Sequence, residues 1–503
     1  MILYKRIILT GTLTTLAPLH IGTGDEITLK DENDDSDKSI SYNSLCLDAN
    51  NKPYIPASSL RGYLRSILSQ YQDDETINKL FGLARQESDG KDTGNIGLLR
   101  IYDALWGGSQ TIGGNSQADY QQQLVSQTSI DPLTATAKEH HLSTHALVDS
   151  NSIFKLTIEL DNVNQQQLIL ILKALNTLGQ EYGGKLGKAK TSGQGSIAWE
   201  HKTLKILTQE KFIEWLGFKN DRLLSEFYQN HPDVPEINAL VEAKTQPYIN
   251  KDSKQLTLAL TVQSPILIND PQARDDVAEQ REKKNKEIEK DEARNSADLL
   301  FVPDLLFTQS NKQAIIPGSS LKGWVRARCR KILLTLMKNA DSTQEKNIDT
   351  IVDALLGSTE QQGLIEFNHA TVSFTDNEIH QQTFTAIDRF TGGVKDGALY
   401  QAESIWPENP FTVKIRYQET QLKGWMKLLL LFVIRDATEG DLILGWGKGK
   451  GYGRLILSSP QYPDWQSLYK TLDTDELQNW QKDLNDKLDL HQEIQKEAQE
   501  ANA

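Results

Sequence analysis

The segment Tyr54-Ile-Pro-Ala-Ser-Ser-Leu-Arg-Gly-Tyr-Leu-Arg65 decides the fold, because it recurs about 260 residues later as Ile315-Ile-Pro-Gly-Ser-Ser-Leu-Lys-Gly-Trp-Val-Arg326. Other similar segments accompany both copies in the same order. The corresponding pairs are Leu80-Phe-Gly82 and Leu355-Leu-Gly357, Leu98-Leu-Arg100 and Leu364-Ile-Glu366, Ser129–Lys138 and Ala386–Lys395, the apolar runs Leu168–Leu175 and Leu428–Ile434, and the glycine-rich segments Gly183–Gly195 and Gly445–Gly453. Matches that repeat in register predict two tandem copies of one domain.

The duplication sets the expected domain boundaries. We expect a first domain over residues 1–200, a linker over 201–247, a second domain over 248–460 and an acidic helical tail over 461–503. A charged insertion over about 277–297 interrupts the second domain, and its composition predicts a solvated helix or a disordered loop. We expect the linker, the insertion and the tail to decorate the two domains without supplying chemistry.

Composition limits the functional classes. Of the 503 residues, 38% are hydrophobic, which leaves room for two cores. The two cysteines, Cys46 and Cys329, occupy non-corresponding positions, which argues against a disulfide framework and favours the cytoplasm. The longest apolar run is too short to cross a bilayer, and the N-terminus predicts a strand instead of a signal peptide. The formal charge of −14 excludes a uniformly basic surface, although a local basic stripe can still bind phosphates.

Each copy predicts an α+β domain with the order β-α-β-β-α-β. Residues 5–15 alternate between apolar and polar side chains, and residues 256–262 open the second copy in the same way. Helices are expected at Ser58–Ser69 and Ser319–Met337, with a serine as the N-cap. Further strands are expected at Gly97–Tyr102, Ile153–Leu160, Ser196–Trp199, Gly363–Phe367, Phe411–Tyr417 and Arg454–Ile456. This order predicts two tandem ferredoxin-like domains, the arrangement that RNA-recognition modules share.

The start of the first helix in each copy has the composition of a phosphate-binding site. Free backbone N–H groups and the helix dipole favour an anion there, and basic residues spaced four apart share one helix face. The predicted RNA-binding residues are Ser58, Ser59, Arg61 and Arg65 in the first copy and Ser319, Ser320, Lys322 and Arg326 in the second. Arg328, Arg330 and Lys331 are expected to enlarge the second basic patch.

The glycine-rich segments combine a bare backbone with positive charge. Glycine permits close approach, and lysine supplies charge toward phosphates. The candidate phosphate contacts are Lys185, Lys188, Lys190, Lys448 and Lys450. Neither segment has the Walker A spacing, so we do not expect a nucleotide-hydrolysing loop.

Together, these motifs resemble the RAMP superfamily, and specifically the backbone subunits of type III CRISPR effector complexes. The resemblance rests on the string Leu19-His-Ile-Gly-Thr-Gly-Asp-Glu26, the Ile-Pro-x-Ser-Ser helix start, the Ile-Asp-x-x-Thr segment and the terminal glycine loop. It covers both copies, and two fused backbone domains resemble the type III-D arrangement. The second copy departs from the pattern, because Pro265–Asp270 replaces the first string.

The resemblance implies an RNA-guided function. Such subunits line up along a CRISPR guide RNA together with further RAMP backbone proteins and a large subunit. Each inserts a protruding hairpin, the thumb, into the duplex of guide and target RNA. The segments Ile130–Lys138 and Ile387–Lys395, which include Asp131 and Asp388, match the thumb. Active members cut the target RNA with an aspartate and a divalent cation such as Mg²⁺, through attack by the adjacent 2′-hydroxyl.

The resemblance implies that the catalytic, metal-binding aspartate lies in the loop after the first strand. In the first copy the candidates are Asp34 and then Asp35, within a run of acids. In the second copy they are Asp298 and Asp276. The endoribonuclease activity that we expect has two alternatives: a non-catalytic structural RNA-binding subunit, or an endonuclease that processes the guide precursor. For the latter, His140, His141 and His145 are weaker candidates for acid–base chemistry.

Overall fold

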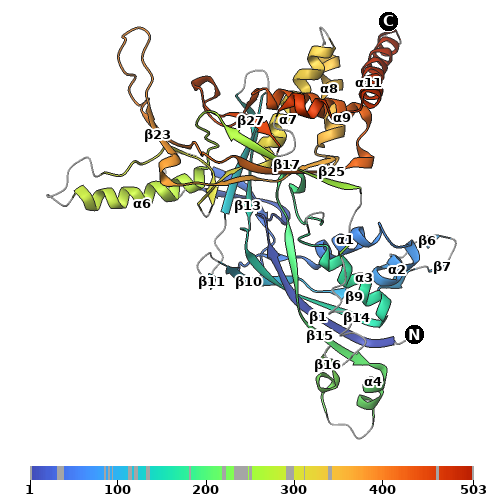
Figure 1. Cartoon of the computed structure of the whole chain (residues 1–503). Coiled ribbons are helices and arrows are strands. Elements are labelled where there is room, and N and C mark those ends of the chain that lie inside the picture. Colours follow the sequence, from blue (N-terminus) through green and yellow to red (C-terminus); the bar gives the residue numbers. More distant parts are fainter. Residues whose placement is uncertain are drawn as a thin grey trace. The chain divides into compact units, whose positions relative to one another are not determined.

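The structure is a computed structural model (Figure 1). The residues that it describes are 3–30, 39–83, 87–88, 91–92, 94–110, 116–117, 123–131, 136–180, 183–217, 222–230, 247–248, 252–289, 299–310, 312–337, 342–459 and 464–500. The chain divides into two compact units. The first comprises Met1–Ser126, Ser143–Lys190 and Gln194–Lys251, and the second comprises Gln127–Leu142, Thr191–Gly193 and Asp252–Ala503.

The main sheet of the first unit has the strand order of a ferredoxin-like fold. β1 (Leu3–Thr15) lies between β14 (Ser152–Asn164) and β15 (Ile197–Thr208), antiparallel to both. β14 also pairs with β9 (Leu99–Ile101) and β10 (Ala104–Gln110). The order is therefore fourth, first, third and second strand of the β-α-β-β-α-β unit. The predicted fold class is confirmed for this copy.

Periodic apolar side chains explain the elements that cover this sheet. Ile7, Leu9 and Leu13 of β1 are fully buried on one face, as the alternating pattern predicts. The helices α1 (Ala57–Leu68) and α3 (Gln165–Asn176) place apolar residues at helical spacing into the same core. Other elements of this copy are α2 (Asp74–Phe81), β4 (Tyr54–Ile55), β5 (Gly82–Leu83), β6 (Glu87–Ser88), β7 (Lys91–Asp92), β8 (Asn95–Ile96) and β11 (Ser116–Gln117).

The second unit repeats the topology. β17 (Ser253–Val262) lies between β25 (Phe411–Gln418) and β27 (Arg454–Ser458), and β25 also pairs with β21 (Ile365–Phe367) and β22 (Ala370–Ser373). Shorter elements here are β19 (Gln309–Ser310), β20 (Gln313–Ile316), β26 (Leu442–Ile443) and the 3₁₀ turns Asp376–Glu378 and Glu419–Gln421. Both copies therefore share one strand order, as the duplicated sequence predicts.

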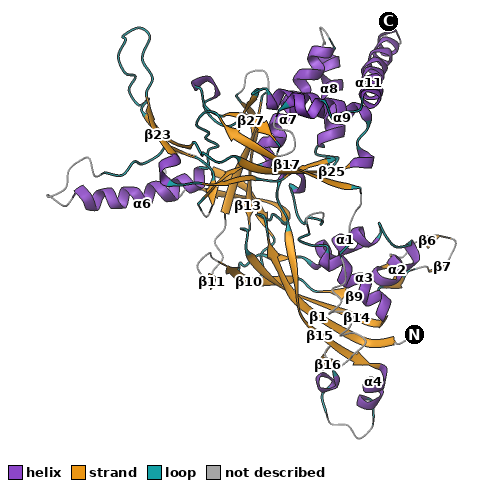
Figure 2. Ribbon diagram, in the orientation of Figure 1, coloured by secondary structure: helices purple, strands orange, loops and turns teal. Residues whose placement is uncertain are grey.

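Helices gather on one side of this second sheet (Figure 2). They are α7 (Gly318–Leu336), α8 (Ser342–Leu356), α9 (Gly424–Thr438), α10 (Trp465–Tyr469) and α11 (Thr474–Glu500). The tail helix α11 contributes Leu484 and Leu488 to the core, and Asp483 Oδ2 accepts a hydrogen bond from Trp425 N at the start of α9 (2.8 Å). The amphipathic tail therefore packs on the body of its own unit.

Each copy also carries a hairpin that belongs to a smaller sheet. The strands are β2 (Gly22–Lys30), β3 (Ser39–Leu45), β12 (Gln123–Ile130) and β13 (Ala137–Leu147) in the first copy, and β18 (Leu305–Leu306), β23 (Ile379–Phe384) and β24 (Tyr400–Ile405) in the second. In the first copy, β13 pairs in parallel with β3, which precedes α1. In the second copy, β24 pairs in parallel with β18, which precedes α7. The loop after β23 extends away from the rest of its unit (Figure 1).

The described part of the charged insertion, up to residue 289, lies in the helix α6 (Pro271–Glu289), and α6 makes a buried contact with the second hairpin. Arg281 of α6 makes a bidentate ion pair with Glu403 of β24, at 2.7 and 3.3 Å, and the Glu403 side chain is 1% exposed. Gln381 of β23 donates a further hydrogen bond to Glu403 (3.0 Å). Because a buried carboxylate is costly without such partners, this contact anchors the insertion to the base of the second hairpin.

The linker begins inside the fold of the first unit. β15 continues to Thr208, beyond the expected boundary at residue 200, and is followed by α4 (Gln209–Trp215). A 3₁₀ turn (Leu224–Phe227) then leads to β16 (Gln229–Asn230), which pairs with β15.

Both cysteines are buried free thiols. None of the helices in the described part of the chain is long and apolar enough to cross a membrane.

Candidate nucleic-acid interface

The first glycine loop is held by backbone hydrogen bonds to the turn that follows β1. Leu186 N donates to Gly195 O (2.9 Å), and Gly195 N donates to Pro18 O (2.9 Å). Lys188 N donates to His20 O (2.9 Å). The loop therefore lies against the residues that open the first copy's motif, with its lysines carried on a fixed backbone.

The second glycine loop repeats these bonds one for one. Leu444 N donates to Gly453 O (2.9 Å), Gly453 N donates to Pro265 O (2.8 Å), and Trp446 N donates to Leu267 O (2.7 Å). The corresponding backbone positions thus make the same contacts, although Pro265–Asp270 differs in sequence from the first copy's string. The two copies therefore share the geometry of the glycine loop, although the sequence of the turn that the loop contacts differs between them.

Glycine is required where the loop crosses that turn. Gly187 and Gly445 occupy equivalent places with φ of +80° and +84°. A Cβ atom there would lie 2.2 Å from His20 O or 2.3 Å from Leu267 O, closer than any real contact. The glycines thus serve the close approach of two backbone segments.

The loop lysines differ in accessibility. A 3₁₀ turn occupies the same position in both loops, over Lys190–Ser192 and Lys448–Lys450. Lys188, Lys448 and Lys450 are exposed, and Lys190 is half-buried. Lys185 is only 6% exposed, and its Nζ donates to Lys190 O (3.0 Å). Lys185 therefore supports the loop from inside, while Lys188, Lys448 and Lys450 present charge toward solvent and Lys190 is partly accessible.

The expectation that a serine caps each first helix is wrong. The N-cap positions are Pro56 and Pro317, and neither helix shows a side-chain cap from them. Ala57 N, the first helical amide of α1, donates instead to Asp103 Oδ1 (2.7 Å). In α7 the equivalent Gly318 N donates to His369 Nδ1 (3.0 Å). Protein acceptors therefore already occupy the first amide, and the carboxylate at α1 opposes a phosphate at that point. Ser58, Ser59, Ser319 and Ser320 all lie in the first turns.

The arginines of these helices bind protein groups. Arg65 Nη2 donates to Asn78 Oδ1 of α2 (3.0 Å), and Arg326 pairs with Asp353 of α8 at the equivalent position. Arg61, on the same face of α1, donates to main-chain carbonyls, at 3.5 Å for Leu99 O. Lys322 lies one turn before Arg326 on α7. Arg65 thus joins α1 to α2, and Arg326 joins α7 to α8.

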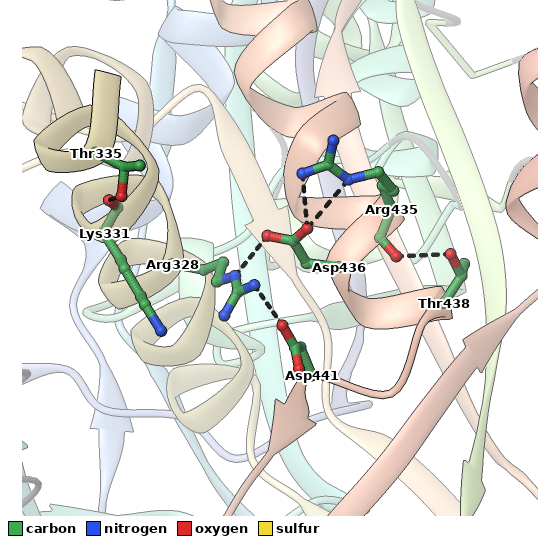
Figure 3. Close-up of polar contacts among 7 residues, drawn as sticks. All are labelled: Arg328, Lys331, Thr335, Arg435, Asp436, Thr438 and Asp441. Carbon is green, nitrogen blue, oxygen red and sulfur yellow. Dashed lines mark hydrogen bonds and ion pairs between the residues drawn. The ribbon is translucent and has the colours of Figure 1, made fainter. Parts of the chain in front are cut away.

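The basic patch expected farther along α7 is ion-paired. Arg328 Nε contacts Asp436 Oδ2 of α9 and Arg328 Nη2 contacts Asp441 Oδ2, both at 2.6 Å (Figure 3). Arg435 approaches the other Asp436 oxygen at 3.0 Å, and Arg330 pairs with Asp349 at 3.1 Å. The Asp436 side chain is 7% exposed, so this pairing joins α7 to α9 in a poorly solvated place. The prediction that Arg328 and Arg330 enlarge a free cationic surface is therefore wrong, whereas Lys331 is exposed.

The two segments assigned to thumbs lie at hairpin tips. Ile130 at the end of β12 and Lys138 at the start of β13 are exposed, and Asp131 N donates to Thr136 O (2.8 Å), while residues 132–135 of this segment lie outside the described residues. Between β23 and β24, Ile387 and Lys395 are exposed.

One aspartate organises the second tip. Asp388 Oδ1 accepts hydrogen bonds from Phe390 N and Thr391 N, both 2.9 Å, and these bonds lower the pKa of Asp388. The turn holds the Phe390 side chain fully exposed. Phe390 was not singled out in the sequence analysis. The feature that could have identified it is an aromatic residue within a polar, glycine-containing turn.

The candidate metal ligands do not assemble in the described part of the chain. Asp34, Asp35 and Asp298 lie outside the described residues. Asp276 lies on the exposed face of α6, and no three His, Cys, Asp or Glu side chains group as metal ligands among the described residues. A lone exposed carboxylate is a poor site for a divalent cation, so Asp276 by itself does not fit the expected metal.

Two histidines pack together behind the first glycine loop. The rings of His20 and His145 lie 5.4 Å apart between centroids, and His20 Nδ1 is 2.7 Å from Ala146 O. Burial, with the charge of Lys188, lowers the pKa of His20; burial, Lys188 and His20 lower that of His145 to about 4. His140 and His141 are exposed on β13 and do not join this pair. Because His20 is only 5% exposed, the geometry favours a neutral structural pair over a catalytic one.

Comparison with known families adds one finding. The family model of the RAMP superfamily matches the chain twice, over residues 12–198 and 260–456. No curated protein matches the sequence. Each matched region begins within the first strand of a ferredoxin-like sheet, ends within its last strand, and contains one glycine loop.

Proposed function

Because the chain belongs to the RAMP superfamily, we propose that it is an RNA-binding backbone subunit of a type III CRISPR effector ribonucleoprotein. The observation that carries this proposal is the repeated glycine loop. Each copy fixes the same loop by the same backbone bonds and presents lysine on the same 3₁₀ turn, at Lys190 and Lys448. A lysine at the same place of each copy, on a loop held by backbone hydrogen bonds, suits contact with the phosphates of a single strand.

The proposed ligand is the CRISPR guide RNA, and the remaining partners follow from it. Contacts of lysine with phosphates position a strand without reading its sequence, so one subunit can bind any guide. The exposed residues Ile130 and Lys138 of the first hairpin, and Ile387 and Lys395 of the second, are then available to the duplex of guide and target RNA. Further RAMP backbone proteins and a large subunit would complete the complex, in the type III-D-like arrangement of fused domains.

We further propose that at least one copy cuts the target RNA with the help of a divalent cation. The support is the family resemblance of the loops that contain Asp34 and Asp298. The described residues add no ligand set to it.

Assembled complexes with a labelled target RNA test both parts. Wild-type complex should give at most two cut positions within this chain's footprint, and each should need a divalent cation. Asp34→Ala should remove one cut and Asp298→Ala the other, because each copy would build its own site. Glu282→Ala, which changes an exposed carboxylate of α6 that is not a catalytic candidate, is the matched control.

The outcomes separate the alternatives. If guide binding persists and every cut survives both substitutions, Asp34 and Asp298 are not the catalytic residues. The chain would then be a structural RNA-binding subunit. Loss of both cuts in Asp34→Ala, with normal assembly, would mean one shared active centre. Cleavage of guide precursor by the isolated chain in excess EDTA would identify a processing endonuclease. Absence of any RNA binding by the full chain would reject the proposal altogether.

A further inference from the structure

Three aromatic rings meet at the base of the second hairpin. Phe384 ends β23, Tyr400 begins β24, and Trp446 belongs to the glycine loop. The rings of Phe384 and Tyr400 are stacked, with centroids 5.2 Å apart and planes at 17°. Trp446 stands edge-on to both, at 5.4 Å and 70° from Phe384 and 6.0 Å and 87° from Tyr400. All three side chains are partly exposed.

A lysine of the same glycine loop lies over these rings. Lys450 Nζ is 5.1 Å from the centroid of Phe384 and 5.8 Å from those of Tyr400 and Trp446. An ammonium at these distances is attracted by the ring faces. Lys450 is nevertheless exposed and stands on the same turn as the exposed Lys448, so the cluster places aromatic faces beside two exposed positive charges.

The aromatic cluster has a fixed support. Tyr452 packs edge-on to Trp446 with centroids 5.5 Å apart, and its hydroxyl donates to Gln382 Oε1 of β23 (2.5 Å). Tyr452 is 5% exposed, so it forms the floor of the cluster and the other three rings form its open part.

The fold of the glycine loop does not require this cluster. The first copy has Lys188, Ser192 and Gln194 where the second has Trp446, Lys450 and Tyr452, yet both loops make the same backbone hydrogen bonds. Aromatic side chains at these positions therefore add something that only the second copy has.

We propose that Phe384, Tyr400 and Trp446 form a stacking subsite for one nucleobase of a single-stranded RNA. Lys450 leaves the rings for the phosphate of the stacked nucleotide when RNA binds. The proposal rests on the proposed RNA-binding function and adds base contact at the second copy. Stacking beside lysine is a recurring mode of single-strand binding, and it tolerates any sequence because every base has a π face.

Two ligands of equal length test the subsite: a single-stranded RNA of mixed sequence and its abasic counterpart, which keeps the phosphates and lacks the bases. The full chain should bind the RNA more tightly than the abasic strand. Trp446→Leu should weaken RNA binding by about tenfold and leave abasic binding unchanged. Trp446→Phe should keep most of the affinity, and Trp406→Leu, at a tryptophan 48% exposed outside the cluster, should change neither ligand.

Lys450→Gln separates the charge from the rings. It should make the salt dependence of binding shallower by about one counterion for both ligands. Equal loss of both ligands in Trp446→Leu would reflect damage to the loop and would overturn the stacking subsite. Unchanged RNA binding in Trp446→Leu would also overturn the stacking subsite, but it would leave the proposed RNA-binding function intact. A wild-type chain that binds neither ligand would instead reject the underlying RNA-binding function.

Discussion

At the scale of single residues, basic side chains that look alike in the sequence have different environments in the fold. Lys185 is buried under its own loop, whereas Lys448, in the corresponding loop of the other copy, is exposed. Arg326 and Arg328 both pair with carboxylates. An arginine already held by an acid must give up that partner to bind a phosphate, so the exposed lysines are the stronger candidates for RNA contact.

His145 supports a prediction about pH. Its folded-state pKa of about 4 lies below the unfolded value of 6.5, so protons bind the unfolded state more readily between these two values. The stability that His145 contributes is thus present above about pH 6.5 and is lost as the pH falls toward 4. Between pH 7 and 5 we expect the free energy of unfolding of the first unit to fall by roughly 1 to 2 kcal/mol from this group.

Urea denaturation at both pH values checks this. His145→Gln should flatten the decrease, because glutamine keeps a polar contact with Ser143 and does not titrate in this range. His141→Gln, an exposed histidine on the same strand, should keep the wild-type slope. An unchanged slope in His145→Gln would show that other groups, such as His20, cause the acid sensitivity.

At the scale of elements, α6 and the hairpin β23–β24 are joined by one buried ion pair. Arg281→Met would leave the carboxylate of Glu403 in a nearly solvent-free place, with Gln381 as its remaining side-chain partner among the described residues. We expect a loss of about 3 kcal/mol in the local stability of α6 and the hairpin base. Hydrogen exchange of their backbone amides should therefore become at least tenfold faster.

The control for this prediction lies on the same helix. Lys283 forms an exposed ion pair with Glu279, one turn before it, so Lys283→Met should change exchange little. Equal exchange in Arg281→Met and the wild type would mean that apolar contacts of α6, through Ala273 and Val277, hold the helix in place.

At the scale of the whole molecule, the duplication predicts independent contributions to RNA binding. Lys190→Gln and Lys448→Gln change equivalent positions of the two copies. Each should weaken binding of a long single-stranded RNA and reduce the salt slope by about one counterion. In the double variant the two losses of binding free energy should add, because each lysine belongs to its own loop in its own unit and we expect it to contact its own phosphate.

Titrations at several salt concentrations measure these slopes, and Lys482→Gln, at an exposed lysine of the tail helix α11, is the matched control. A double variant no weaker than either single one would show that only one copy contacts the strand.

The sequence by itself determined the duplication, the order of strands and helices, and the position of the glycine loops. These features are local: alternating side chains in residues 5–15 predict a half-buried strand, and glycine between lysines predicts a close turn. The two copies of each motif could be matched from the sequence alone, because the motifs recur in the same order.

Only the tertiary structure decided which charges are available. Asp103 and His369 reach the helix starts from the residues after β9 and β21, and Asp436 reaches Arg328 from α9. Each partner is distant in sequence, so no spacing rule finds it. The same holds for Phe384, Tyr400 and Trp446, which a hairpin and a loop bring together. Local patterns predict backbone conformation, whereas the environment of a side chain depends on every segment that folds against it.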